Sequence, residues 1–95
     1  MTEPAAPAVR HLHGGVEWEI PVDLLEIQRR FDLADAQCAR LAEGGDPDAY
    51  DAARRQRLEQ AMALHDHPWL VEQMAHGRRH QADMALKHLA RAADT

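Results

Sequence analysis

Histidine is the residue type in this sequence whose spacing could do chemistry. Seven histidines occur in 95 residues, and two pairs have the spacing His-x-His: His11 with His13, and His65 with His67. Imidazole nitrogens are ligands that both Zn²⁺ and Ni²⁺ accept. In a bundle whose second helix returns to the start of the first, these four side chains meet at one end. A divalent-metal-binding protein, with Zn or Ni as cofactor, is therefore an alternative function.

The same histidines also have a structural interpretation. His-x-His without a cysteine is not a recognised zinc spacing, and on a strand the first pair would simply cover Trp18. A further set, His76, His80 and Asp83, has helical spacing but lies opposite the apolar stripe of its segment, which is typical of a solvated face. We therefore predict no bound cofactor.

No catalytic constellation accompanies the histidines. Serine is absent, threonine occurs only at positions 2 and 95, and there is no Gly-x-Gly-x-x-Gly or P-loop motif. The single cysteine, Cys38, lies on an apolar helix seam between Ala34 and Leu41. Because no base stands beside it on that face, we expect a small buried side chain rather than a nucleophile. We predict that the protein is not an enzyme.

Charge and hydropathy limit the class of partner. The formal net charge is −5 with histidines neutral, and an acidic chain is repelled by nucleic acids and anionic membranes. The cluster Gly77-Arg78-Arg79-His80 keeps a small DNA-binding regulator as a weaker alternative. With no signal-peptide pattern and no apolar run of about 20 residues, we expect a cytoplasmic protein without a membrane span. The excess of arginine and alanine is typical of a GC-rich bacterial coding sequence.

The elements that must position these residues are mostly helices. Apolar residues at alternating spacings of three and four predict a helix over about 22–43 that packs along its whole length. The seam residues are Leu24, Ile27, Phe31, Ala34, Cys38 and Leu41. Gly44 is a helix stop, and Asp46-Pro47 is a helix start, so a second helix follows over about 47–65. The two helices form an antiparallel hairpin.

The C-terminal segment after His67-Pro68 predicts a third helix over about 68–92. Its apolar stripe keeps its phase across Gly77, which favours one long helix, although Gly77 weakens it by about 1 kcal/mol relative to alanine. A break at Gly77 is the alternative.

The N-terminal segment predicts a β-hairpin over 9–20, preceded by a disordered tail over 1–8. Val16, Trp18 and Ile20 alternate with glutamates, and Gly14-Gly15 suits a two-residue turn that requires positive φ. The register pairs Val9 with Ile20, His11 with Trp18, His13 with Val16 and Arg10 with Glu19. The predicted fold class is therefore mainly α, a three-helix antiparallel bundle preceded by an N-terminal β-hairpin, in a single domain over 9–95.

An alanine-rich seam and an exposed hairpin edge both favour association. We therefore predict a non-enzymatic protein-interaction module, homodimeric, that regulates or scaffolds a cytoplasmic partner. Aromatic residues and arginine are the usual anchors of such surfaces. The candidate partner-binding residues are Trp18, Tyr50, Arg54, Arg57 and Trp69. Two alternatives stay open, since the aromatics could close the core and the arginines could lie along the rim of the bundle rather than dock an acidic partner.

Overall fold

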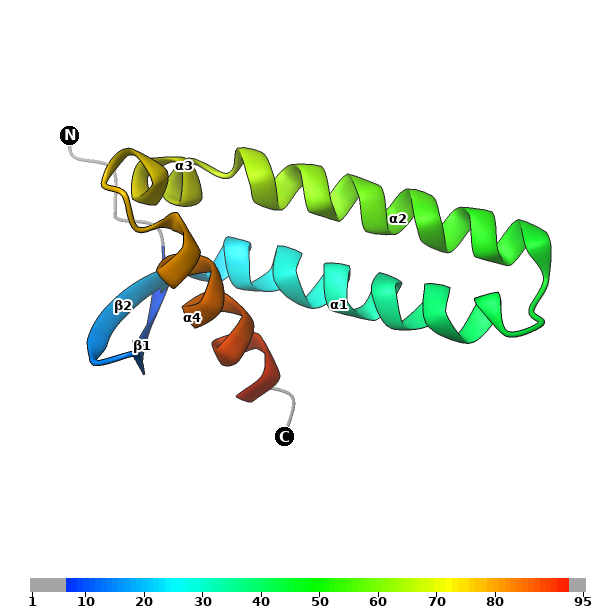
Figure 1. The fold of residues 1–95 in the computed structure, drawn as a ribbon, viewed down its shortest axis with the longest axis horizontal. Helices are drawn as coiled ribbons and strands as arrows, with labels where there is room; N and C mark the ends of the chain where they lie inside the picture. Colours follow the sequence, from blue (N-terminus) through cyan, green and yellow to red (C-terminus); the bar gives the residue numbers. More distant parts are fainter. Residues whose placement is uncertain (1–6, 93–95) are drawn as a thin grey trace.

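The computed structural model describes residues 7–92, and this part of the chain is mainly helical with an N-terminal antiparallel hairpin (Figure 1). The mainly α class and the N-terminal hairpin are therefore confirmed, whereas the described residues form four helices rather than the predicted three-helix bundle. The elements are β1 (Ala8–His13), β2 (Val16–Pro21), α1 (Val22–Ala42), α2 (Pro47–Asp66), α3 (Pro68–Ala75) and α4 (Arg79–Ala92).

The hairpin forms in the predicted register. Val9 pairs with Ile20, His11 with Trp18 and His13 with Val16. Gly14 and Gly15 have φ of 61° and 76°, so both turn residues occupy the left-handed region that the sequence required. Residues 1–6 of the predicted tail lie outside the described residues. The carbonyl of Pro7 accepts a hydrogen bond from the Val22 amide at 2.9 Å, and β1 begins at the next residue.

The predicted third helix is wrong in one respect, because it ends at Ala75 and a separate helix begins at Arg79. Gly77 takes a φ of 72°. The amide of Gly77 donates to the carbonyl of Met74 at 3.0 Å, and the amide of Arg78 donates to the carbonyl of Gln73 at 3.0 Å. These two bonds are the Schellman pattern, which satisfies the last carbonyls of α3 and turns the chain.

The turn between α1 and α2 follows the predicted signals. Gly44 has a φ of 112° just beyond α1, and Pro47 is the first residue of α2. The Asp46 side chain accepts a hydrogen bond from the Asp48 amide at 3.3 Å, so it caps α2. The two helices run back along one another (Figure 1).

The hydrophobic core lies at one end of the molecule, where the hairpin, α3 and α4 meet the first turns of α1 (Figure 1). Leu24 and Leu25 are the contribution of α1 to this core, and Leu70 that of α3. The complete set is Trp18, Ile20, Leu24, Leu25, Leu70, Ala82, Ala85, Leu86, Leu89 and Ala90.

Beyond this core, α1 and α2 continue as a two-helix projection, and we call residues 31–61 the arm. Ala34, Cys38 and Ala53 are its buried side chains. Ala53 is the one buried residue of α2, a helix of 20 residues. Figure 1 shows the arm leaving the hairpin, α3 and α4 behind, and the molecule measures 49 × 32 × 25 Å. Most of the surface of α2 is therefore uncovered.

Candidate protein-binding groove

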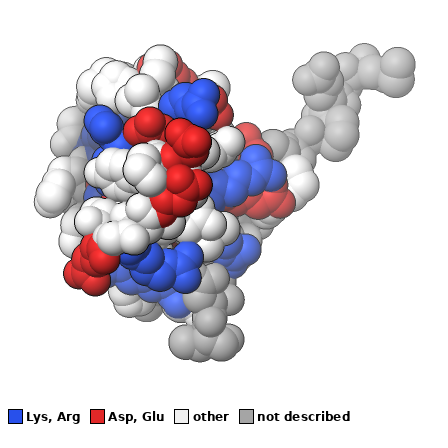
Figure 2. Space-filling model, turned by 90° about the vertical axis from the view of Figure 1, so that its right-hand side faces the viewer, with Lys and Arg blue, Asp and Glu red and all other residues white. Residues whose placement is uncertain are grey.

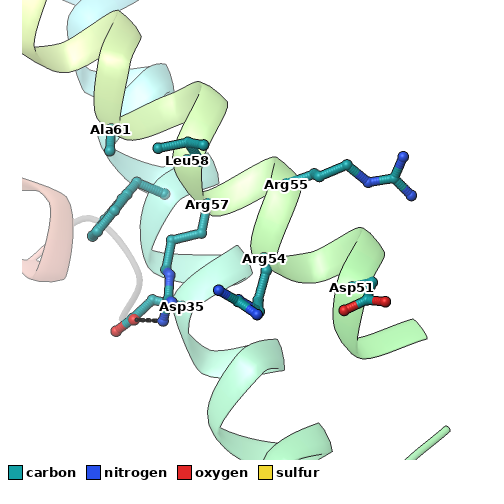
Figure 3. Close-up of a pocket in the computed structure, with 8 residues that line it drawn as sticks. Asp35, Asp51, Arg54, Arg55, Arg57, Leu58 and Ala61 are labelled. Carbon is teal, nitrogen blue, oxygen red and sulfur yellow. Dashed lines mark hydrogen bonds and ion pairs between the residues drawn. The ribbon is translucent and has the colours of Figure 1, made fainter. Parts of the chain in front are cut away.

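An open groove of about 850 Å³ lies along the arm (Figure 3). Its α2 residues lie at positions 51, 54, 55, 57, 58 and 61, and the repeated spacings of three and four place them along one side of the helix. Its α1 residues, Phe31 and Asp35, are also one turn apart. The lining residues are Phe31, Asp35, Asp51, Arg54, Arg55, Arg57, Leu58 and Ala61.

The groove combines an apolar part with a charged part. Leu58 is 60% exposed although it is a large apolar side chain, while Phe31 and Ala61 are half-buried. The charged part has three guanidinium groups and two carboxylates. Exposed apolar surface bordered by charged side chains is a common feature of protein-binding sites.

Two internal contacts hold arginines in the groove. Arg57 Nη1 donates to Asp35 Oδ1 at 3.3 Å, which connects α2 to α1. The Arg54 guanidinium lies 5.7 Å from the centre of the Tyr50 ring, a cation–π contact. In Figure 3, Arg54 and Arg57 extend to the same side of α2, whereas Arg55 points away. Because the Arg57–Asp35 pair is 38% and 58% exposed, it stabilises the fold by only about 0.2–1 kcal/mol, and its main effect is on position.

The structure divides the five predicted partner-binding residues between two places. Arg54 and Arg57 line the groove, and Tyr50 contacts Arg54 one turn away. Trp18 and Trp69 belong to the core at the other end of the molecule. The structure therefore gathers three of the five residues on one surface.

Trp18 is buried in the core, and Trp69 packs half-buried against it. Trp18 is 4% exposed and meets Trp69 edge to face, with ring centres 6.1 Å apart at 70°. Its Nε1 donates to the His13 carbonyl at 3.3 Å. The Arg78 guanidinium lies 5.2 Å from the centre of the Trp18 ring. Trp18 is therefore not accessible to a partner in this conformation.

The structure places the four histidines of the hypothetical metal site in two separate groups, and the rings of His11 and His13 are stacked with their centres 6.4 Å apart. His11 and His13 lie against α4, where both rings are 5.0 Å from the ring of His88. A hydrogen bond of 2.8 Å connects His11 Nε2 with His88 Nδ1. Desolvation, followed by repulsion from His88 and His13, lowers the pKa of His11 below its ordinary 6.5.

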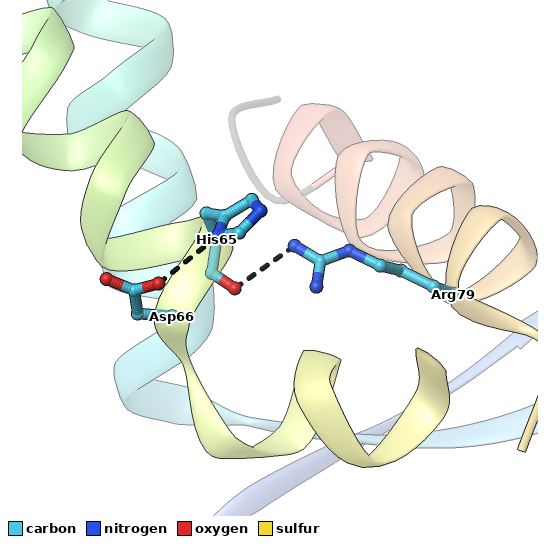
Figure 4. A network of polar contacts seen from close by, with 3 residues as sticks. All are labelled: His65, Asp66 and Arg79. Carbon is cyan, nitrogen blue, oxygen red and sulfur yellow. Dashed lines mark hydrogen bonds and ion pairs between the residues drawn. The ribbon is translucent and has the colours of Figure 1, made fainter. Parts of the chain in front are cut away.

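The second histidine pair lies at the junction of α2 with α3 and makes hydrogen bonds there. His67 Nε2 donates to Asp23 Oδ2 at 2.9 Å, and His67 Nδ1 accepts from the Trp69 amide at 3.1 Å. The first of these bonds lowers the pKa of Asp23. His65 Nδ1 lies 3.1 Å from Asp66 Oδ1, and this contact is drawn in Figure 4. Both ring nitrogens of His67 are thus already used within the chain.

Within residues 7–92, no group of three or more His, Cys, Asp or Glu side chains is arranged to hold a metal ion. The metal alternative is tested by adding Zn²⁺ or Ni²⁺ while thermal unfolding is followed, because a specific site raises the Tm by mass action.

The basic cluster of the C-terminal half makes internal contacts. Arg78 Nε donates to Gln73 Oε1 at 2.7 Å, in addition to its contact with Trp18. Arg79 Nη2 donates to the His65 carbonyl at 3.1 Å, connecting the start of α4 with the end of α2 (Figure 4). Both arginines therefore fix the turn between α3 and α4 in place.

Several groove residues were not among the sequence-based candidates. They are Asp35, Asp51, Arg55, Leu58 and Ala61. Their helical spacing was available from the sequence. What the sequence could not give is that no further element within residues 7–92 covers this face of the arm. His88 was missed for a related reason, since its neighbours on β1 are about 77 residues away in the chain.

The fold and the groove define a small, mainly helical protein in which a hairpin-capped core carries a two-helix arm. The comparison with protein families places the chain more closely, because the model of a family described as a domain of unknown function, DUF8825, matches residues 23–89. The chain belongs to this family. The matched part runs from α1 into α4 and leaves out both strands. No curated protein and no solved structure matches the chain. In residues 7–92 no helix has the length and apolar character needed to cross a membrane.

Proposed function

We propose that this protein is a non-enzymatic interaction module that docks a cytoplasmic partner in the groove of the arm and thereby regulates or scaffolds it. The observation that carries the proposal is the open groove, in which Leu58 is 60% exposed between charged side chains. Hot spots of protein interfaces combine buried apolar anchors with arginine and aromatic residues, and Arg54, Arg57 and Tyr50 supply the latter types here.

The sparse packing of α2 supports a docking role. Most of the stability of a protein helix comes from packing its apolar face against other elements, not from intrinsic propensity. In α2 only Ala53 is buried, so this helix gains little from the rest of the chain. A third helix or strand laid along the arm would bury Leu58 and the exposed part of Phe31.

The inventory of reactive groups supports a non-enzymatic role. The chain has no serine, and its cysteine is 3% exposed within the arm. A thiol at that depth does not reach a substrate without opening of the helix pair.

We also propose that the protein is a homodimer. Eight large apolar side chains are exposed among residues 7–92, and seven of them lie outside the groove. Val71 and Met74 are two of these, both on α3. Surface outside the groove is therefore available to a second copy.

The docking proposal is tested with a matched pair of variants, Leu58→Asp and Leu33→Asp. The two leucines are 60% and 59% exposed and lie on the two helices of the arm, but only Leu58 lines the groove. We expect the wild type and L33D, as immobilised baits, to capture the same protein from an extract of the native host. Capture by L58D should fall about tenfold or more, because a charge replaces an apolar anchor.

Circular dichroism of both variants is the control for folding. Equal capture by L58D and the wild type, or the absence of any specifically captured protein, would contradict the proposal.

A further inference from the structure

We propose that the occupant of the groove is an amphipathic helix of another protein, with acidic residues flanking its apolar stripe. This inference rests on the proposed function and specifies the chemistry of the partner at the same site. It is argued from the shape of the groove, from its charges and from the place of its apolar residues.

The shape of the groove favours a helix. It follows two antiparallel helices, and a third helix can lay its side-chain ridges into the furrow between them. The apolar residues come from both sides of this furrow, Phe31 from α1 and Leu58 with Ala61 from α2. An amphipathic helix meets such a surface with anchors at i, i+3 or i+4, and i+7.

The charges of the groove favour acidic residues on that helix. Among its charged lining residues are three arginines and two aspartates, and one aspartate, Asp35, is already bonded to Arg57. The groove therefore keeps one guanidinium, that of Arg54, whose contact in the structure is with the Tyr50 ring rather than with a carboxylate, although the whole chain has a net charge of −5. Arg54 and Arg57 extend to one side of α2 (Figure 3), where their guanidinium groups can donate paired hydrogen bonds to carboxylates.

The same features disfavour two other occupants. A nucleic acid would place phosphates, which need water or cations, over Phe31 and Leu58. A second copy docked groove to groove would bring the arginines of both copies together, which raises their mutual repulsion. One other face of the protein lacks such a bias. On the face that carries the α1–α2 turn, acidic and basic side chains are interspersed (Figure 2).

The test is a selection of displayed helix-forming peptides on the immobilised full-length protein. The library is randomised at the apolar stripe and at the flanking positions. We expect the selected peptides to be enriched in Asp and Glu beside the stripe. A synthetic selected peptide should bind the wild type and L33D equally, and bind L58D and Arg54→Glu about tenfold or more weakly. Its Glu→Lys counterpart should lose binding to the wild type, and added salt should weaken the acidic peptide because ion pairs at the surface are screened.

Enrichment of basic or neutral flanks, or affinity that is unchanged in both L58D and R54E, would overturn the inference. A dimeric wild type that L58D converts to a monomer would overturn it as well, because the groove would then be covered by a second copy. Capture of a host protein by the wild type and L33D is measured separately from these peptide results, so failure of the inference can be distinguished from failure of the proposed function. If instead the acidic peptides bind as expected and no host protein is captured, the proposed function fails, and with it the claim that a protein of the host supplies the helix, although the preference of the groove for acidic helices is shown.

Discussion

At the residue scale, the imidazoles of His11, His13 and His88 form one group, in which the rings of His11 and His13 each lie 5.0 Å from that of His88. The hydrogen bond between His11 and His88 requires one ring nitrogen to donate and the other to accept, so it depends on at least one ring being neutral. Protonation of both rings removes the acceptor and places like charges next to each other. The contact between β1 and α4 is therefore sensitive to acid.

The pH dependence of stability follows from the pKa of His11. Desolvation and its histidine neighbours lower this pKa in the folded state, so the folded protein binds fewer protons than the unfolded chain. The free energy of unfolding must then decrease as the pH falls through the ordinary value of 6.5 toward the folded pKa. We expect the Tm of the wild type to be lower at pH 5.5 than at pH 7.5. In His88→Gln this decrease should be smaller, because one source of repulsion is gone.

His80→Gln is the matched control, since His80 is an exposed residue of the same helix. Its Tm should decrease with acid as much as that of the wild type, as measured by circular dichroism at the two pH values. An identical decrease in H88Q and H80Q would contradict the assignment of the effect to this histidine group.

At the element scale, the separation of α3 from α4 depends on the backbone conformation of one residue. A β-carbon on Gly77 would meet no atom within 4 Å, so space is not the constraint there. The constraint is the φ of 72°, a left-handed conformation that costs an L-residue about 1–2 kcal/mol. The turn also brings Arg79 to the His65 carbonyl and Arg78 to Trp18.

Replacement of Gly77 by alanine should therefore destabilise the protein by about 1–2 kcal/mol, through the backbone alone. Gly77→Asn should cost less, because the asparagine side chain tolerates the left-handed region. Urea unfolding followed by circular dichroism measures both free energies. A Gly77→Ala variant as stable as the wild type would show that the break between α3 and α4 does not depend on this conformation.

At the scale of the whole molecule, the chain is more extended than its length requires. Its radius of gyration is 15.2 Å, whereas a compact domain of this length has one of about 12 Å. The difference arises from the arm, which leaves the core at one end and buries few large side chains. A small chain with so little buried area gains stability from association.

We therefore expect self-association in solution, with light scattering coupled to size-exclusion chromatography giving about twice the monomer mass of 10.7 kDa. Because seven of the eight exposed large apolar side chains lie outside the groove, the dimer should persist in Leu58→Asp. A monomer at high concentration would remove the homodimer from the proposed function and leave the docking of a partner untouched.

The local parts of this architecture were decided by the sequence itself. The hairpin register follows from Gly14-Gly15 and the alternation around Trp18, and the turn between the long helices follows from Gly44 and Asp46-Pro47. These signals act through backbone conformation and through hydrogen bonds between residues close in the chain, so they can be read without knowing the fold.

The candidate site was decided by the tertiary structure. Gly77 separates α3 from α4 although the apolar stripe continues in phase on both sides. The stripe did not reveal this break, because its spacing is the same whether the helix is straight or folded back. Trp18 is buried, Trp69 is half-buried and Arg54 is exposed for a reason of the same kind. Periodicity assigns a residue to a face of its helix or strand, but which faces remain uncovered depends on where every other element packs.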